Sequence, residues 1–480
     1  MENVLFVNSP SCFSFYLGTR INAIVQTYPL LSHSILAAVV RNSKKRASIL
    51  DLGIVRDWEK VLAEEIKNFS PDVICMTSTT TLFPEVAQMS YFIRKMVGQR
   101  IKLVLGGPHA TVLPEESLRL SAFDIVITGE GENPLVKLIT GLPYNEIAGI
   151  YYKEGGAIYS TAGSDPVENL DSLPFLAFDL YNLKKYKCSK IICKRYPLVN
   201  YMTSRGCPYK CTFCNHNIFG TKIRYKSPDL VMAEIKHMLK LGIKEIRIID
   251  DAFTFDIARA KLICELIIRN NLKFPWTLAA GLRVDCLDLE FLKLAKKAGL
   301  YQVSLGFESG DQDSLDSINK KISIKQSIDA MELVKKAKLE SIGFFMLGLP
   351  ADTEKSLQKT INFAVRLSPT FAKVALTIPF PGTELFADYE KKGLIKSRAW
   401  NMYNLHSSAD IYRHPNLEIK TIKKYYNKFY YAFYLRPGYL IASLCRSVWN
   451  LSIIDYICYG IQTFFPKIFK PRIKIKKTYL

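Results

Sequence analysis

The sequence of 480 residues predicts an α/β protein with two consecutive strand–helix series and a helical tail. Short apolar runs of strand length alternate with longer amphipathic stretches along most of the chain. The length also exceeds that of one ordinary domain. We expect a doubly wound, Rossmann-like domain, a connector, a partial (β/α)6 TIM-type barrel and a basic aromatic helical region, bounded at 1–150, 151–195, 196–412 and 413–480.

The first series contains five apolar runs that are typical of buried parallel strands: Val4–Val7, Ala47–Asp51, Val73–Thr77, Lys102–Leu105 and Asp124–Ile127. Doubly wound sheets bind ligands at the carboxyl ends of their strands. A nicotinamide or flavin crevice would require a Gly-x-Gly-x-x-Gly turn after the first strand. The turn that follows this strand contains no glycine, which argues against such a crevice. We still expect a cofactor crevice, because small and polar residues follow four of the strands: Ser9, Thr77, Ser78, Gly106, Gly107, His109, Gly129 and Glu130.

The second series follows an irregular connector. Within the connector, Tyr151–Tyr159 reads as a small hairpin that turns at Gly155 and Gly156. Helical stretches then separate six strand-like runs, at Val199–Thr203, Glu245–Ile249, Trp276–Ala280, Gln302–Phe307, Ser341–Leu347 and Phe371–Ile378. Six such units favour a partial barrel over an open sheet, and chemistry in barrels gathers at the carboxyl ends of the strands.

Three cysteines follow the first strand of the second series directly, at Cys207, Cys211 and Cys214. Three thiolates can hold three irons of a four-iron cubane and leave the fourth iron open to a ligand. His216 lies two residues further on and would make a fourth ligand for structural zinc. A zinc-stabilised binding protein is therefore the alternative to an iron–sulfur enzyme.

The C-x3-C-x2-C spacing, with Phe213 before the last cysteine, resembles the signature of the radical S-adenosylmethionine (SAM) superfamily. The resemblance implies a [4Fe-4S] cluster on the three cysteines, whose open iron chelates SAM, and reductive cleavage to a 5′-deoxyadenosyl radical. An external donor such as flavodoxin or ferredoxin would supply the electron.

The resemblance also implies contacts to SAM at the ends of the later strands. The methionine amino group would meet Asp250 or Asp251, although the Gly-Gly-Glu of many members is absent there, and the carboxylate would meet Arg283. The alternatives are structural: a helix cap for the aspartates, a lysine partner for Glu308 and a plain turn at Gly348. By the same analogy, the ribose and adenine would be contacted by Glu308, Ser309 and Gly348.

The first domain resembles that of the cobalamin-binding subfamily of these enzymes, through LGGPHATVLPEE at Leu105–Glu116 and TGEGENPL at Thr128–Leu135. The Asp-x-His-x-x-Gly motif that supplies a histidine to cobalt is absent, so cobalamin is expected without that ligand. A degenerate domain with no cofactor is the alternative. The pairing implies methylation of an unactivated carbon, or else a cobalamin-dependent radical cyclisation or rearrangement without methyl transfer.

Composition bears on location and partners. The 11 cysteines do not resemble a secreted disulfide framework, no stretch of about 20 residues lacks charge, and we expect a cytoplasmic protein. The net charge is +21, and residues 413–480 hold 13 Lys and Arg against 2 Asp and Glu. Basic and aromatic residues interleaved there suit a membrane interface through 436–480 and a lipid-like or other small-molecule substrate, or else a helical cap on the barrel; nucleic acid is not expected.

Overall fold

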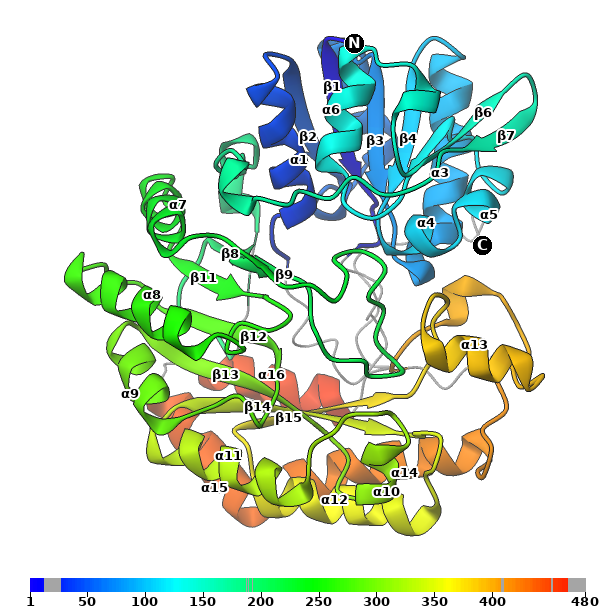
Figure 1. Ribbon diagram of the computed structural model, residues 1–480. Helices are drawn as coiled ribbons and strands as arrows, with labels where there is room; N and C mark the ends of the chain where they lie inside the picture. The colour runs from blue at the N-terminus through cyan, green and yellow to red at the C-terminus, as the bar shows by residue number, and fades with distance from the viewer. Residues whose placement is uncertain are drawn as a thin grey trace.

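The computed structural model describes residues 1–12, 27–186, 188, 190–191, 193–406, 410–449 and 452–464. It contains two α/β units, one above the other, with the cysteine segment between them (Figure 1). The expected class, a doubly wound domain followed by a partial barrel and C-terminal helices, is confirmed.

The first sheet has the strand order β2-β1-β3-β4-β5-β6-β7. Its first five strands are parallel, and the last two form an antiparallel hairpin at one edge. The hairpin expected in the connector is therefore part of the sheet. The strands are β1 (Asn3–Asn8), β2 (Arg46–Asp51), β3 (Val73–Thr77), β4 (Lys102–Gly106), β5 (Ile125–Ile127), β6 (Ile150–Glu154) and β7 (Ala157–Ser160).

Helices cover both faces of this sheet, so its central strands bury apolar side chains on both faces. Along β1, Leu5 and Val7 pack into one core while Val4 and Phe6 pack into another on the opposite face. The helices are α1 (Leu31–Asn42), α2 (Trp58–Phe69), α3 (Phe83–Val97), α4 (Pro108–Val112), α5 (Pro114–Arg119) and α6 (Glu132–Thr140).

The second sheet has six parallel strands in the order β15-β14-β13-β12-β11-β8. No pairing joins β8 to β15 among the described residues, so the barrel is open on one side. Its strands are β8 (Leu198–Tyr201), β11 (Glu245–Ile248), β12 (Trp276–Leu282), β13 (Leu300–Glu308), β14 (Glu340–Leu347) and β15 (Phe371–Leu376).

Each outer helix of the barrel begins at a residue suited to cap it. Ser227, Asp256, Asp288, Ser323 and Thr353 each accept a hydrogen bond from a backbone N–H in the first turn. The N-cap of α8 is thus Asp256, and not one of the two aspartates, Asp250 and Asp251, that follow β11. The helices are α7 (Pro228–Lys240), α8 (Ile257–Arg269), α9 (Leu289–Lys297), α10 (Gln312–Asp316), α11 (Ile324–Lys336) and α12 (Glu354–Leu367).

The C-terminal helices divide into a buried and an exposed part. Helix α14 (Ile419–Tyr434) buries Tyr426, Phe429 and Phe433 against the barrel, so this aromatic stretch is a helical cap. The others are α13 (Glu384–Lys391), α15 (Pro437–Trp449) and α16 (Ile453–Phe464). Among the residues that the structure describes, no helix has both the length and the apolar character to cross a membrane.

Candidate functional site

The three cysteines lie on a loop that leaves the carboxyl end of β8 and is closed at its base by a short ladder of β9 (Ser204–Arg205) and β10 (Arg224–Tyr225). Gly206 has φ +95°, and a Cβ there would lie 2.3 Å from the Lys222 carbonyl oxygen, so the turn requires glycine. The loop is fixed to the barrel because Thr212 N donates to Ile318 O at 3.1 Å and Leu385 N to Thr212 O at 2.9 Å.

The thiols gather where positive charge can offset a negative cluster. Loss of water raises the pKa of Cys207 and of Cys211. Cys214 is exposed at the opening, yet the surrounding protein and Cys211 still raise its pKa to about 12. Iron would therefore have to displace protons on binding. Arg283 hydrogen-bonds Cys211, and Lys320 acts on Cys211 and Cys214 electrostatically. This donor set fits a thiolate-bound [4Fe-4S] cluster.

The zinc alternative calls for four ligands on one ion. In the described part of the chain, no three His, Cys, Asp or Glu side chains converge as they would around a single metal ion. A cubane holds each thiolate on a separate iron, so it does not require that convergence.

Lys320 is a site residue that the sequence analysis missed. Its ammonium lies 2.8 Å from Glu308 Oε1 and 5.9 Å from the centre of the Phe213 ring, and the residue is 5% exposed. Burial lowers its pKa, but Glu308 and Cys211 raise it above the usual value. Nothing in the local sequence distinguishes this lysine from its neighbours, because its partners are distant along the chain. Phe213 packs beside Ile318 and Leu349.

Two carboxylates at the strand ends have different surroundings. Asp250 is 1% exposed and accepts hydrogen bonds from Thr203 N (2.6 Å) and Ser204 Oγ (2.7 Å), so it anchors the start of the cysteine loop. Asp251 is exposed and accepts a hydrogen bond from the Gly206 amide, beside Cys207. Asp250 thus has partners within the protein, and Asp251 is the more accessible of the two carboxylates.

Glu308 is buried and has an unusual backbone conformation. Its φ is +59°, and the pairing of β13 with β14 shifts register at this residue. A residue other than glycine rarely adopts this backbone conformation without a local reason. The lysine partner proposed as an alternative for Glu308 is present, as Lys320.

Three other residues expected to contact SAM have different partners. Ser309 follows β13, and its hydroxyl lies 3.0 Å from Thr360 Oγ1 in α12. In addition to its hydrogen bond with Cys211, Arg283 donates to Asp285 and to the Lys320 and Lys321 carbonyl oxygens. Gly348 has φ +85°, and a Cβ there would lie 3.0 Å from Ile422 Cδ1 in α14, so it shapes a turn.

A cavity of about 300 Å³ lies where the carboxyl edge of the first sheet meets the cysteine loop. Of the expected cobalamin residues, Thr77, Gly106, Gly107, Gly129 and Glu130 line it. Gly107 has φ +94°, and a Cβ would lie 2.3 Å from Thr77 Oγ1, so the backbone passes closely here. The barrel side contributes Met202, Arg205, Ile218, Phe219 and Ile249, so both domains form the cavity.

The remaining three residues do not line this cavity in the described structure. His109 is fully buried and stacks on Phe83 with a centroid separation of 4.1 Å, and burial lowers its pKa to about 4. It follows Pro108 in α4, so one helical step turns it away from the cavity. Ser78 donates to the Thr79 carbonyl oxygen, and Ser9 is buried near Glu85. His109 therefore packs against Phe83 and does not line this cavity.

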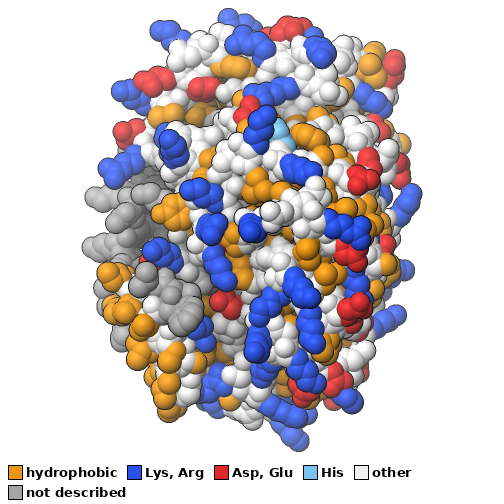
Figure 2. Space-filling model, turned by 90° about the vertical axis from the view of Figure 1, so that its left-hand side faces the viewer, with side chains coloured by type: hydrophobic (Ala, Val, Ile, Leu, Met, Phe, Trp, Pro, Cys, Tyr) orange, Lys and Arg blue, Asp and Glu red, His pale blue; other side chains and the backbone are white. Residues whose placement is uncertain are grey.

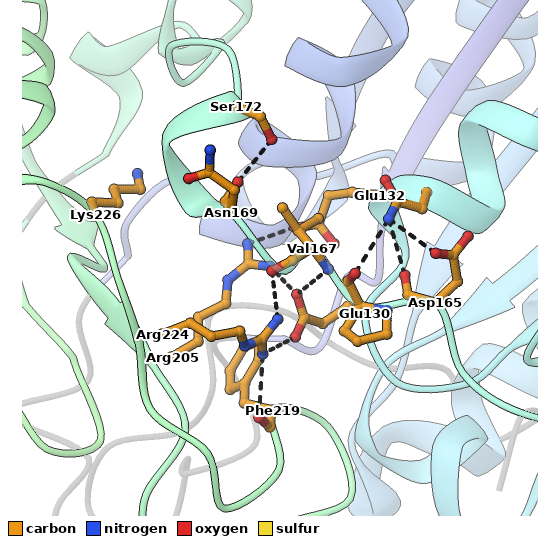
Figure 3. A network of polar contacts seen from close by, with 12 residues as sticks. Glu130, Glu132, Asp165, Val167, Asn169, Ser172, Arg205, Phe219, Arg224 and Lys226 are labelled. Carbon is orange, nitrogen blue, oxygen red and sulfur yellow. Dashed lines mark hydrogen bonds and ion pairs between the residues drawn. The ribbon is translucent and has the colours of Figure 1, made fainter.

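A buried network of four charges joins the two domains beside the cavity (Figure 3). Arg205 pairs with Glu130 and Glu132, and Arg224 pairs with Glu130 and donates to Val167 O at 2.6 Å. All four side chains are at most 7% exposed. Burial lowers the pKa of Arg205, but Glu132 and Glu130 raise it above the usual value. We call this network the interdomain clasp. Glu130, expected to bind cobalamin, belongs to it.

Comparisons with known proteins agree with this geometry. Residues 201–364 match the family model of the radical SAM superfamily, and residues 21–139 match that of the B12 binding domain. The chain is 33% identical over 426 residues to an uncharacterized methyltransferase of Pyrococcus horikoshii, covering 87% of this chain and 90% of that protein.

Two further proteins extend the comparison. An anaerobic magnesium-protoporphyrin IX monomethyl ester cyclase of Rubrivivax gelatinosus is 30% identical over 345 residues, 70% of this chain and 61% of the cyclase. The fold is similar to that of OxsB, a cobalamin-dependent SAM radical enzyme whose structure has aqua-cobalamin and SAM bound. The TM-score is 0.74 at 17% identity, and the match covers 97% of this chain and 72% of OxsB.

Proposed function

The chain belongs to the cobalamin-dependent radical SAM enzymes, and from that premise we propose that it methylates an unactivated carbon of a small or lipid-like molecule. The observation that carries the proposal is the shared cavity. The cysteine loop lines it through Ile218 and Phe219, and the B12 binding domain lines it through Gly106 and Gly107. A corrinoid held at this edge would contact the loop that carries the three cysteines.

Three groups would be held at this site. Cys207, Cys211 and Cys214 would hold the [4Fe-4S] cluster, Asp251 and Glu308 would contact SAM, and the Gly106–Gly107 turn would admit cobalamin. When bound, the three groups would supply removal of a hydrogen atom from substrate carbon, as 5′-deoxyadenosine, and its replacement by a methyl group that a second SAM provides.

The chain's own residues orient these groups and exclude water. Lys320 stands beside both the thiols and Glu308, so it would fix the carboxylate and lower the local negative charge. Asp250 accepts a hydrogen bond from Thr203 N, and the Arg283 guanidinium lies 3.6 Å from the centre of the Tyr209 ring in the cysteine loop, so both act as positioning residues. The apolar wall of Phe6, Val104 and Ile127 keeps the cavity dry.

Anaerobic turnover tests the proposal. Protein reconstituted with iron and sulfide, then given SAM, hydroxocobalamin and a strong reductant, should release 5′-deoxyadenosine, and methyl-labelled SAM should mark a product in cell extract. The triple Cys207→Ala, Cys211→Ala, Cys214→Ala variant should lose iron and both products, whereas Cys445→Ser, an exposed cysteine on α15, should keep them. Absence of 5′-deoxyadenosine from protein with a full iron content would contradict the proposal.

A radical cyclisation without methyl transfer is the second candidate, because the cyclase of Rubrivivax gelatinosus aligns with 70% of this chain. Both reactions would consume SAM and release 5′-deoxyadenosine. They differ in the fate of the label: a cyclase product would carry no methyl group from SAM.

Contact with an anionic membrane surface is a further part of the proposal. Helices α15 and α16 expose aliphatic side chains, and hydrophobic side chains gather at the lower edge of the face in Figure 2. The sequence from 437 to 480 holds seven Lys and Arg against one Asp, which suits anionic headgroups. The exposed residues are Leu440, Ile441, Leu444, Val448, Ile453, Ile454, Ile457 and Ile461.

Liposome flotation tests the membrane contact. The full chain should float with vesicles that contain phosphatidylglycerol, and Ile441→Glu with Ile454→Glu should abolish flotation, because these are the two most exposed of the aliphatic residues, at 65% and 77%. Equal flotation of both proteins would refute it. We retain the cytoplasm as the location and a flavodoxin or ferredoxin as the electron donor.

A further inference from the structure

His33 is a buried polar residue whose position the fold alone does not explain. It lies in the first turn of α1, is 1% exposed and lines the shared cavity. Neither ring nitrogen has a hydrogen-bond partner among the residues that the structure describes. Its ring centroid is 5.6 Å from that of Phe6. A buried polar group without a partner destabilises the fold, so a leucine would stabilise the empty protein better.

The cavity around His33 suits a flat aromatic group. Its wall is apolar, with Phe6, Leu36, Val104 and Leu135. At about 300 Å³ it is at the small end of ligand pockets and holds only part of a corrinoid. At the Gly106–Gly107 turn no side chain projects from the backbone, so a chain of atoms can pass there from the sheet edge. A corrinoid carries such a group: a planar base, usually a nitrogen heterocycle, on a flexible nucleotide chain.

We propose that His33 recognises the nucleotide base of the bound corrinoid and so selects corrinoids whose base carries a ring nitrogen. The neutral imidazole has one N–H donor, which can donate to the free ring nitrogen of such a base. A phenolic base lacks such a nitrogen and would leave His33 without a partner. The inference rests on the proposed function, since it presumes that this domain binds a corrinoid.

Burial keeps the imidazole in the form that this recognition needs. Desolvation lowers the pKa of His33 to about 3, so the ring is neutral at physiological pH. A neutral His33 ring can line an apolar cavity without the large free-energy penalty of a buried charge. His109 has the same burial and the same lack of partners but faces the other core, so it provides a matched control.

Corrinoid titrations of purified protein test the inference, with affinity as the readout. The probes are hydroxocobalamin, cobinamide, which has no nucleotide base, and a cobamide with a phenolic base. His33→Leu should weaken cobalamin binding by roughly 5- to 150-fold, the range for leaving one buried polar atom unpaired. It should leave cobinamide binding unchanged and remove the preference over the phenolic cobamide. His33→Asn should keep part of that preference, and His109→Leu all of it.

Each outcome decides the matter. Unchanged cobalamin affinity in His33→Leu, or an equal loss for cobinamide, would overturn the role of His33 while the proposed function stands. If the unaltered protein binds neither cobalamin nor cobinamide, the proposed cofactor falls and this inference falls with it. Thermal melting of the corrinoid-free variants shows whether His33→Leu is misfolded. If it is, the corrinoid affinities of His33→Asn and His109→Leu are compared instead.

Discussion

The interdomain clasp gives the sharpest prediction of stability. The clasp is neutral, because two guanidinium groups face two carboxylates, all nearly excluded from water. Arg205→Met keeps most of the aliphatic packing but leaves Glu130 and Glu132 with only Arg224. One net negative charge then stays buried without a partner. Removal of one member of a buried ion pair destabilises a fold by about 3–5 kcal/mol. The contact between the two domains should weaken by that amount, or roughly 10²- to 10⁴-fold.

A charge-neutral double variant separates this electrostatic cause from a packing cause. Arg205→Met with Glu132→Gln leaves one guanidinium and one carboxylate, so about 1–3 kcal/mol should return relative to the single variant. Lys222→Met is the control, since it breaks an ion pair at the surface. The side chains of Lys222 and Glu168 are 78% and 64% exposed. This variant should leave the stability almost unchanged, because solvent screens an exposed ion pair.

Limited proteolysis of the connector measures the population of the open state, and denaturant midpoints provide an independent check. Because the protein has two domains, the midpoints are compared only between variants. If the double variant is cleaved as fast as the single variant, the argument from buried charge is wrong.

Three further predictions concern single residues. His109→Leu should stabilise the protein in acid: the folded pKa of about 4 lies below the unfolded value of 6.5, so the unfolded chain alone gains a proton between them. The variant's free energy of unfolding should exceed that of the unaltered protein increasingly below pH 6.5, by about 2 kcal/mol at pH 5 in denaturant titrations, and the excess should level off near pH 4. A constant difference in the free energy of unfolding from pH 8 to 5 would contradict this. Gly107→Ala should reduce bound corrinoid, measured by absorbance, because its Cβ would overlap Thr77, whereas Gly155→Ala, at φ +56° in open space, should not. Lys320→Met should lower the iron content after reconstitution, because it leaves the buried Glu308 charge unpaired; full iron content and unchanged melting would refute that role.

Much of the fold could be predicted because burial on both faces makes each parallel strand a continuous apolar run. The five runs of the first sheet and the six of the barrel coincide with strands for this reason. The cysteines could be found because their spacing is local. The hairpin after residue 150 was visible, but its addition to the sheet edge was not, since a pairing partner leaves no mark in a nearby sequence.

The candidate site was predicted less completely because it depends on side-chain direction and on distant partners. Position at a strand end was correct for both Glu308 and Ser309, but adjacent strand residues face opposite ways. His109 was expected at the sheet edge, but it follows Pro108 by one helical step and is buried against Phe83, which the local sequence does not indicate. Lys320 and His33 were missed since neither belongs to a local motif, and what marks them is burial beside residues far away in the chain.

The clasp also bears on how enzymes of this kind could be recombined. Its arginines come from the cysteine loop's base and its glutamates from the edge of the first sheet. A chimera that joins this first domain to another barrel would place Glu130 and Glu132 in an interdomain interface without their arginine partners. Modular exchange should therefore succeed only when the four residues are transplanted as a set.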